Sequence, residues 1–504
     1  MRYLVDGSQM KAEDQYTIQT IGTPSLVLME RAARCCVQVM TDRYLDLSRV
    51  CVVCGSGNNG GDGLAIARIL TKMGYPVTAC FIGNKEHCTE ETKEQIRLLK
   101  EAGGRIISGY EEAEYSVLID AIFGVGLSRK IEGHYREIID QMNRSTGIKV
   151  AVDIPSGISS GNGAVLGIAF HADITVTFQL EKLGLQMYPG REYAGEIYPV
   201  DIGICTDRIK DDISVAYTYE RREYSRLLPV RKADSHKGTY GKLLVIAGSR
   251  GMSGAAYLNA KAAYRTGAGL VQIYTPEENR VILQTLLPEA IITAYETFEE
   301  EKLCSLLAWA DTVCIGSGLG TNGLSKQILQ TTLKNIKVPC VIDADGLNLL
   351  SENMEALKQI SNGEIVLTPH MKEMERLSGR MVSEIREHRT TVLREFTEQY
   401  PAVVALKDAR TMVASSESRI YVNLSGNCAM AKAGSGDVLA GIIAGLMAQK
   451  VNGYDAAVLG VYLHGCCGDY ARKIMGSYSV MAEDLIESLS KVLIDQEELA
   501  YEEI

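Results

Sequence analysis

The sequence predicts an α/β protein of two domains, each a three-layer α/β/α sandwich around a mostly parallel β-sheet. In both halves, short apolar runs rich in β-branched residues alternate with stretches of helical length. Strands that are apolar throughout are typical of parallel sheets covered by helices on both faces. The length of 504 residues also exceeds what a single core usually supports, so two domains are expected.

The first half supplies one complete set of alternating elements. Strands are expected at 50–54, 77–82, 116–122, 149–154 and 174–178, and helices at 64–73, 92–102 and 135–142. A segment with charged runs, 205–238, then breaks the alternation, which places the domain boundary there. The predicted domains are therefore 1–215 and 225–504.

The second half repeats the pattern and ends in helices. Strands are expected at 242–247, 270–274, 312–315, 339–342, 364–367 and 402–406, and helices at 255–265, 437–449, 456–473 and 482–493. The longest apolar run near the C-terminus, 438–447, contains two glycines and is too short to cross a bilayer. We therefore expect no membrane segment.

Composition argues against several classes of protein. The net charge of −11 is opposite to the basic field of a general nucleic-acid binder. The N-terminal residues lack the apolar core of a signal peptide. The 13 cysteines are scattered without paired C-x-x-C motifs, so zinc is not expected. Their apolar surroundings indicate reduced thiols and a cytoplasmic protein.

A glycine-rich string, GSGNNGGDG, follows the first predicted strand at Gly55. A turn of this kind that opens a helix presents backbone N–H groups to an anion. Gly60 and Gly61 are expected to allow positive φ angles and close approach of a ligand. Asn59 is a candidate cation ligand, and Asp62 could bond a ribose or its own loop. The alternative is a purely structural turn.

Two later strands end in carboxylates, Asp120 and Asp153. Parallel strands bring their carboxyl ends to one edge of the sheet, where open α/β sheets bind ligands. Asn59, Asp120 and Ser156 offer hard oxygen ligands for an alkali or alkaline-earth cation, which leaves Asp153 for proton transfer. The alternative is that Asp120 and Asp153 only cap the following helices.

A second glycine-rich string, AGSGDVLAG, opens an apolar helix near the C-terminus. Gly434 and Gly436 flank Ser435, and their backbone N–H groups could hold a transferring phosphoryl group. Asp437 follows directly and is placed to accept a proton from an attacking hydroxyl. The alternative role of Asp437 is stabilisation of the helix dipole.

Further strand ends of the second half carry polar residues. His370 could orient a substrate, although a lone histidine is more often structural. The segment after the strand at 402–406 offers two cations and a hydroxyl for a nucleotide phosphate. Asp343 and Asp345 are candidates to lie near Mg²⁺.

The first half resembles the YjeF N-terminal domain family, the NAD(P)H-hydrate epimerases, over residues 1–210. The resemblance rests on NNGGDG, DAIFGVGL, VDIPSG and ADITVTF. It implies a Rossmann-like fold, catalysis by Asp153, and K⁺ bound by Asn59, Asp120 and Ser156. It also implies that the hydrated nucleotide contacts Asp153 and Asn58, Asn59, Gly60, Gly61, Asp62, Gly124, Val125, Gly126, Leu127, Ser128, Arg129 and Lys130.

The second half resembles the ribokinase-like NAD(P)H-hydrate dehydratases from about residue 225, through HKGTYGKLLVIAGS, DADGLN, LTPH and AGSGDVLAGIIAGL. The resemblance implies that Ala255, Gly318, His370 and Asp437 bind the substrate. It places the adenine nucleotide on Lys407, Asp408, Ala409, Arg410, Thr411, Gly434, Ser435 and Gly436. The chain departs from the family pattern at Met371-Lys372, Asp408 and Arg410.

Together the resemblances imply a cytoplasmic homo-oligomer that repairs hydrated NADH and NADPH. The first domain would epimerise the R and S hydrates by loss of the hydroxyl to an iminium and re-addition of water, with Asp153 as acid and base. The second would use ADP, or ATP, with Mg²⁺ to dehydrate the S hydrate, with Asp437 as base. The alternative is a ribokinase-like vitamin-precursor kinase fused to a non-catalytic Rossmann-like domain.

Overall fold

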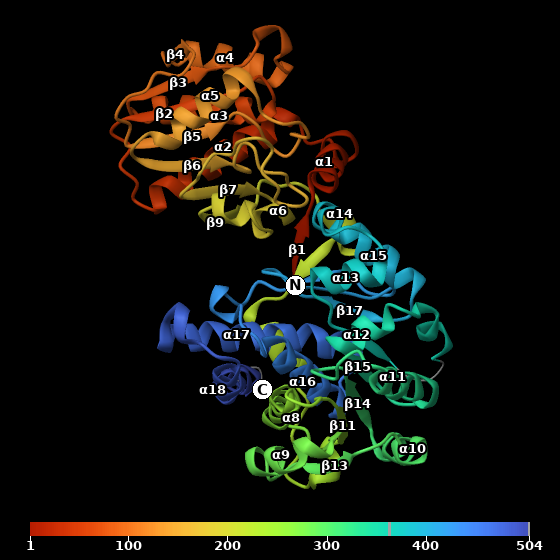
Figure 1. Cartoon of the computed structure of the whole chain (residues 1–504). Coiled ribbons are helices and arrows are strands. Elements are labelled where there is room, and N and C mark those ends of the chain that lie inside the picture. Colours follow the sequence, from red (N-terminus) through yellow and green to blue (C-terminus); the bar gives the residue numbers. More distant parts are fainter. Residues whose placement is uncertain (361–363, 502–504) are drawn as a thin grey trace. The chain divides into compact units, whose positions relative to one another are not determined.

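The computed structural model describes residues 1–360 and 364–501. The chain forms two compact units, one of Tyr3–Ala216 and one of Met1–Arg2 with Tyr217–Ile504. Figure 1 labels the elements of each unit. We call them the N-terminal and the C-terminal unit and describe each by itself.

The N-terminal unit contains a parallel seven-stranded sheet. Its strand order is β4 (Arg105–Ser108), β3 (Val77–Phe81), β2 (Val50–Cys54), β5 (Val117–Ala121), β6 (Ile148–Val152), β7 (Ile174–Phe178) and β9 (Glu196–Val200) (Figure 1). Val50 of β2 pairs with Val77 on one side and with Val117 on the other. The chain order therefore reverses between β2 and β5, the point where doubly wound sheets bind ligands.

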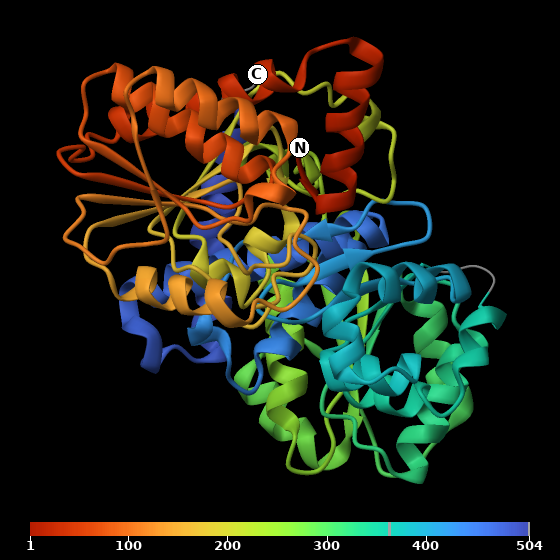
Figure 2. The same cartoon turned by 90° about the horizontal axis from the view of Figure 1, so that it is seen from above.

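Helices cover both faces of this sheet. The helices α2 (Ser25–Asp42), α3 (Asn58–Lys72) and α4 (Glu90–Glu101) lie on one side and α5 (Gly133–Arg144) on the other (Figure 2). Alternate residues of β2 divide between two cores, because Val52 packs with Leu64 of α3 and Val53 packs with Ile138 of α5. The remaining elements are β1 (Arg2–Val5), α1 (Gly7–Tyr16), the π-helix η1 (Thr17–Ile21), β8 (Glu181–Lys182), α6 (Leu183–Gln186) and α7 (Gly190–Tyr193).

The C-terminal unit contains a second sheet with the same reversal. Its order runs β13 (Ile291–Tyr295), β12 (Leu270–Pro276), β11 (Lys242–Ile246), β14 (Thr312–Ile315), β15 (Cys340–Ile342), β16 (Ile365–Leu367), β17 (Val403–Leu406), β18 (Met412–Ala414), β19 (Tyr421–Val422) and β10 (Ala216–Thr218). The pairs from β13 to β17 are parallel, and β18 is antiparallel to β17 and to β19. The reversal lies between β11 and β14.

Helices flank this sheet as well (Figure 1). They are α8 (Ser253–Thr266), α9 (Arg280–Leu286), α10 (Glu300–Trp309), α11 (Gly323–Asn335), α12 (Asp345–Leu350), α13 (Met371–Ser378), α14 (Val382–Glu387), α15 (Arg389–Gln399), α16 (Ser435–Ala448), α17 (Gly453–Ser479) and α18 (Ala482–Tyr501). The α16 helix is buried from Val438 to Ala448 and packs against α8. A helix that is apolar all round belongs in a core, which explains the sequence of α16.

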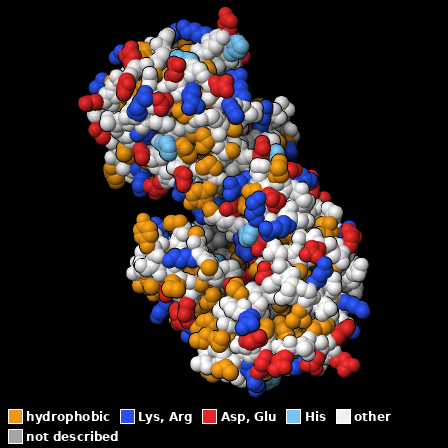
Figure 3. Space-filling view, viewed as in Figure 1, with side chains coloured by type: hydrophobic (Ala, Val, Ile, Leu, Met, Phe, Trp, Pro, Cys, Tyr) orange, Lys and Arg blue, Asp and Glu red, His pale blue; other side chains and the backbone are white. Residues whose placement is uncertain are grey.

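The structure confirms the predicted α/β architecture of both halves, and every predicted strand is present within two residues of its expected ends. The prediction missed eight strands in the part of the chain that the structure describes, β1, β4, β8, β9, β10, β13, β18 and β19. Of these, β4, β9 and β13 have partly exposed side chains that do not form a continuous apolar run. Among the described residues, no helix combines the length and the apolar character needed to cross a bilayer. Acidic and basic side chains are interspersed on the face drawn in Figure 3.

Candidate functional sites

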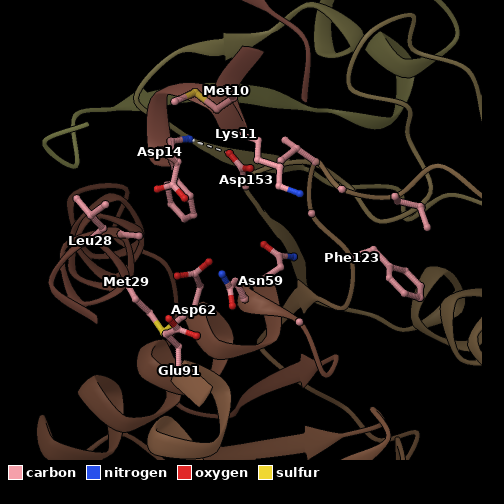
Figure 4. Close-up of a pocket in the computed structure, with 18 of the residues that line it drawn as sticks. Met10, Lys11, Asp14, Leu28, Met29, Asn59, Asp62, Glu91, Phe123 and Asp153 are labelled. Atoms are coloured by element: carbon pink, nitrogen blue, oxygen red, sulfur yellow. Dashed lines mark hydrogen bonds between the residues drawn. The ribbon is translucent and has the colours of Figure 1, made fainter. Parts of the chain in front are cut away.

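A cavity of about 540 Å³ opens in the N-terminal unit at the reversal between β2 and β5. Three strand ends supply its walls: Ser56–Asn59 follow β2, Ile122–Arg129 follow β5, and Asp153 follows β6. Other lining residues come from α1 and α2, among them Met10, Lys11, Asp14, Leu28 and Met29 (Figure 4). The cavity therefore brings together most of the residues predicted for the first site. The exceptions, which are not part of its lining, are Gly60, Gly61, Lys130 and two of the predicted K⁺ ligands, Asp120 and Ser156.

The expected backbone conformation of Gly60 and Gly61 was wrong. Both lie inside the first turns of α3, and neither has a positive φ angle. A Cβ atom at Gly60 would lie 2.0 Å from the carbonyl oxygen of Gly55, and one at Gly61 would lie 2.6 Å from Cε of Met29. Glycine is required at both positions because the start of α3 packs directly against neighbouring chain segments. The GSGNNGGDG string therefore runs into the first turns of a helix instead of forming a loop.

Asp153 is held in one orientation by a buried lysine. Its Oδ1 accepts hydrogen bonds from Nζ of Lys182 and from the backbone N–H of Phe178, the latter at 3.0 Å. Lys182 is fully buried and also donates to Oγ1 of Thr177 at 3.0 Å. Among the described residues nothing donates to Oδ2 of Asp153, which leaves that oxygen for a ligand. Asp153 also adopts a positive φ of 66°, a strained conformation for a residue with a side chain.

Sequence reasoning missed Lys182. The residue follows ADITVTF after only a few positions, but nothing in its local pattern distinguishes it from a surface lysine. A lysine that is fully buried must have a charged or polar partner, and only the fold shows that the partner is Asp153.

Three more carboxyl groups, those of Asp14, Asp62 and Glu91, line the same cavity (Figure 4). Burial raises the pKa of Asp62 well above its ordinary value, and the charges of Asp153 and Asp14 raise it further. Burial likewise raises the pKa of Asp14, with additional effects from Asp153 and Glu91. Asp14 was missed by sequence reasoning because it lies on α1, far along the chain from the glycine-rich string.

Asp120 and Ser156 form a closed hydrogen-bonded pair. Oδ1 of Asp120 accepts from Oγ of Ser156 at 2.7 Å, and Oδ2 accepts from the backbone N–H of Ser156 at 2.7 Å. Asn59 lies against Gly124: a Cβ atom built on Gly124 would be 3.4 Å from Oδ1 of Asn59. Asp120 is fully buried without an ion pair to any described residue, and burial raises its pKa to about 6.

The second site is built from the carboxyl ends of successive strands in the C-terminal unit. Asp343 follows β15, and its Oδ1 accepts from Oγ1 of Thr368 after β16 at 2.6 Å and from Nζ of Lys407 after β17 at 2.8 Å. Ser317, after β14, donates to Oδ2 of Asp343 at 3.5 Å. The fold thus joins residues spread over 91 positions into one buried polar cluster, which we call the Asp343 cluster.

Asp437 lies in the first turn of α16 beside this cluster. Burial and, to a smaller extent, the charge of Asp343 raise the pKa of Asp437 to about 7, although a hydrogen bond from Ser317 opposes the shift. Gly434 caps the helix with a φ of 89°, a conformation that favours glycine. A Cβ atom at Gly436 would be 3.4 Å from Nζ of Lys407, so the ammonium lies next to the helix start.

The other residues predicted to bind nucleotide have protein partners. Asp408 forms an ion pair of 2.7 Å with the nearly buried Arg389. Arg410 is buried and donates to the carbonyl oxygen of Leu424 at 2.9 Å. Thr411 donates to the carbonyl oxygen of Asp408 at 3.4 Å, and Ala409 is exposed in the same turn. This turn follows β17 directly. Lys407 therefore reaches the Asp343 cluster, whereas Arg410 bonds to the backbone of Leu424 within the same unit.

Three of the residues predicted to bind the second substrate, Ala255, Gly318 and His370, and the Mg²⁺ candidate Asp345 lie at strand ends and helix starts of the C-terminal unit. Gly318, with a φ of 60°, lies against Ala255, since a Cβ atom would be 2.8 Å from that of Ala255. His370 caps α13, and its Nδ1 accepts from the backbone N–H of Lys372 at 3.0 Å. Asp345 accepts from the backbone N–H of Gly320 at 2.8 Å, so it fixes the loop after β14.

His464 was missed by sequence reasoning. It lies on α17, and its Nε2 is 3.2 Å from Oγ of Ser435 at the start of α16. Burial lowers the pKa of His464 to about 4, so the ring is neutral at physiological pH. Its position next to Ser435 depends on the packing of α16 against α17, which no local pattern reveals.

Comparison with known proteins assigns a different family to each half of the chain. Residues 25–184 match the family described as YjeF-related protein N-terminus, and residues 243–491 match the NAD(P)H-hydrate dehydratase family. A solved ADP/ATP-dependent NAD(P)H-hydrate dehydratase from Bacillus subtilis, co-crystallised with ATP and Mg²⁺, is 30% identical with a TM-score of 0.50; the match covers 55% of this chain and 98% of that one.

Two curated relatives match nearly the whole chain. The bifunctional NAD(P)H-hydrate repair enzyme Nnr of Moorella thermoacetica is 35% identical, covering 98% of this chain and 97% of the relative. The enzyme of the same name from Escherichia coli is 34% identical, covering 94% and 90%. The chain belongs to the family of bifunctional NAD(P)H-hydrate repair enzymes.

Proposed function

We propose that the chain repairs hydrated NADH and NADPH in two steps, one in each compact unit. The N-terminal unit interconverts the R and S hydrates. The C-terminal unit dehydrates the S hydrate to NAD(P)H with ADP as phosphate donor, giving AMP and phosphate. Two features that occur together in one chain carry this proposal. One is Asp153, whose carboxyl group is held by Lys182 in a cavity of about 540 Å³. The other is the buried carboxyl group of Asp437 beside a helix start suited to phosphate.

In the N-terminal unit, Asp153 takes up and returns the proton of the water that adds to the ring. Its ion pair with Lys182 orients the carboxyl group, and its Oδ2, to which no described residue donates, is available to that water. The residues predicted to contact the substrate and found in the lining, Asn58, Asn59, Asp62, Gly124, Val125, Gly126, Leu127, Ser128 and Arg129, surround the same space. Gly60 and Gly61 then support the site by packing rather than by contact.

In the C-terminal unit, Asp437 accepts the proton of the substrate hydroxyl as that oxygen attacks the phosphoryl group. The backbone N–H groups at the start of α16 and Nζ of Lys407 stabilise the charge on the transferring group. A carboxyl with a pKa of about 7 is well matched to proton transfer near neutral pH. Loss of phosphate from the product then restores the dihydronicotinamide ring.

We also propose that K⁺ binds at Asn59, Asp120 and Ser156. The supporting observation is Asp120, a fully buried carboxyl that accepts three hydrogen bonds but has no cationic partner among the described residues. Burying an unpaired carboxylate is costly, and a cation held by oxygen atoms would offset that cost. K⁺ would orient the substrate, while proton transfer remains with Asp153.

Mg²⁺ and the nucleotide belong to the C-terminal site in this proposal. Mg²⁺ is usually held by one or two carboxylates together with substrate phosphates, and Asp343 and Asp345 lie close to Asp437. We propose ADP as the phosphate donor, with ATP as the alternative. The working division of the chain is 1–215 for the epimerase and 225–504 for the dehydratase, in a cytoplasmic homo-oligomer.

Recovery of NADH absorbance from a mixture of R and S hydrates tests the whole proposal. With the full chain, Mg²⁺, K⁺ and ADP, we expect complete recovery; without ADP, no recovery. With Asp153→Ala, recovery should stop after the S hydrate is used. With Tris replacing K⁺, conversion of R to S should slow while pure S hydrate is still dehydrated. A stable phosphorylated alcohol as the only product would instead indicate a small-molecule kinase.

A further inference from the structure

The hydroxyl of Ser435 meets a buried histidine at the start of α16. Nε2 of His464 lies 3.2 Å from Oγ of Ser435. A serine at the start of a helix commonly bonds to the backbone N–H groups of that turn, but no side chain of the described residues caps α16. His464 is 9% exposed, whereas Ser435 is only partly buried. The hydroxyl therefore lies between a buried ring and the partly exposed start of the helix.

Close packing of α17 fixes His464 in this place. At Gly460, one turn before His464, a Cβ atom would lie 2.6 Å from Cγ1 of Ile443 on α16, so the two helices approach closely there. At Gly465, the residue after His464, a Cβ atom would lie 2.1 Å from Oγ of Ser425. The place of His464 is therefore set by backbone packing on both sides of it, rather than by the rotation of a surface side chain.

The hydrogen-bonding capacity of these groups fixes the direction of each bond once phosphate is present. Burial and, to a smaller extent, the charge of Lys407 lower the pKa of His464 to about 4, so the ring is neutral at physiological pH. A neutral ring has one N–H donor and one acceptor nitrogen. Phosphate oxygens only accept, so the Ser435 hydroxyl must donate its proton to bind one. Both bonds of the hydroxyl then form only if Nε2–H of His464 donates to Oγ.

We propose that His464 is a positioning residue of the dehydratase site, which donates to Oγ of Ser435 and so directs the Ser435 hydroxyl proton to the phosphoryl group at the start of α16. The proposal rests on the proposed function, which brings phosphate to this helix. Ser435 then adds a side-chain donor to the backbone N–H groups of α16 and to Nζ of Lys407. His464 transfers no proton and does not touch the substrate, because it acts through Ser435.

Full-length Ser435→Ala, His464→Leu, the double variant and His464→Gln test this assignment in the ADP-dependent dehydration of S hydrate. Leucine resembles histidine in size but has no donor, whereas the amide nitrogen of glutamine can replace Nε2 and does not titrate. We expect Ser435→Ala and His464→Leu each to lower kcat/KM for ADP about 10- to 100-fold. The double variant should be no slower than the slower single variant, because both changes remove the same interaction. His464→Gln should stay within about threefold of the wild-type chain.

Nucleotide binding gives a second measurement. Calorimetric titration should show weaker binding of ADP to Ser435→Ala and to His464→Leu but unchanged binding of AMP, because AMP lacks the phosphoryl group that is transferred. Lys473→Gln, an exposed change on α17, serves as the control and should alter neither titration. Scanning calorimetry checks that each variant is folded, and His464→Met replaces His464→Leu if the leucine variant is not.

Three results would overturn the assignment. The first is a loss caused by His464→Leu that is as large in the Ser435→Ala background as in the wild-type chain, which would indicate packing alone. The second is wild-type affinity for ADP in Ser435→Ala, and the third is a His464→Gln variant as impaired as His464→Leu. If the wild-type chain binds ADP but forms no NADH from S hydrate, the proposed function fails instead, and the ADP and AMP titrations of the same variants still test His464.

Discussion

At the scale of single residues, the two sites rest on buried carboxyls with different neighbours. Asp153 forms an ion pair with the buried Lys182. Asp437 has no such ion pair with a described residue, and burial together with the charge of Asp343 raises its pKa to about 7. Perturbed carboxyls of this kind cluster at functional sites because proton transfer requires them.

The raised pKa of Asp437 predicts the pH dependence of dehydration. As a base, Asp437 must be ionised, so kcat/KM for S hydrate should fall about tenfold per pH unit below pH ~7 and level off above it. Asp437→Asn should reduce dehydration about 10²–10⁴-fold while epimerisation continues. Steady-state kinetics between pH 5 and 9, roughly, measure both effects. A profile that stays flat through pH ~7 would remove Asp437 from the role of base.

At the scale of elements, strand ends and helix starts position these residues. The strand order reverses between β2 and β5 in one sheet and between β11 and β14 in the other. Helix α3 begins at the site of the first sheet, and helix α16 begins at the site of the second. The two helix starts are built differently. The start of α16 needs a glycine with positive φ at 434. The start of α3 needs glycines because a Cβ atom would meet backbone at Gly60 and the Met29 side chain at Gly61.

The start of α3 predicts a sharp contrast between two neighbouring glycines. Gly60→Ala places Cβ 2.0 Å from the carbonyl oxygen of Gly55, whereas Gly57→Ala meets nothing within 4 Å and has an ordinary φ of −84°. We expect Gly60→Ala to lower the free energy of unfolding of the N-terminal unit by ~3 kcal/mol and Gly57→Ala by less than ~1 kcal/mol. Urea unfolding of the full chain measures the difference, and equal effects would contradict this account of α3.

At the scale of the whole molecule, each compact unit contains its own sheet, core and candidate site. The C-terminal unit begins at Tyr217, before the start at 225 expected from the sequence. Tyr217 pairs with Tyr421 in the sheet, and Tyr224 stacks on Tyr462 with ring centroids 3.4 Å apart. The tyrosines between 217 and 224 therefore belong to the C-terminal core.

These contacts predict how fragments behave. A fragment of residues 217–504 should fold and dehydrate S hydrate with a kcat close to that of the full chain. A fragment of residues 225–504 lacks the buried rings of Tyr217 and Tyr224 and should melt at a lower temperature, since removal of each buried aromatic costs about 3–5 kcal/mol. Calorimetry and the ADP-dependent assay compare the two. If the longer fragment folds but is inactive, the second site requires the N-terminal unit.

The sequence alone determined the α/β architecture and, for each site, the residues that belong to recognisable motifs at strand ends and helix starts. Apolar runs such as Val50–Cys54 predicted the buried strands because parallel strands covered on both faces admit few polar residues. The rule that parallel strands end at one edge correctly grouped Asp153 with the strings after β2 and β5. Asp343, Lys407 and Asp437 came together for the same reason.

Only the tertiary structure decided which partners complete each site. Lys182, Asp14 and His464 come from a short strand and two helices that local sequence does not connect to the motifs. The conformation of Gly60 and Gly61 was also decided by the tertiary structure. A sequence shows that glycine is present, but not whether the position needs a positive φ angle or close packing. Side-chain burial and pairing arise from contacts between distant segments, and those contacts set the charge state of the residues that the motifs supply.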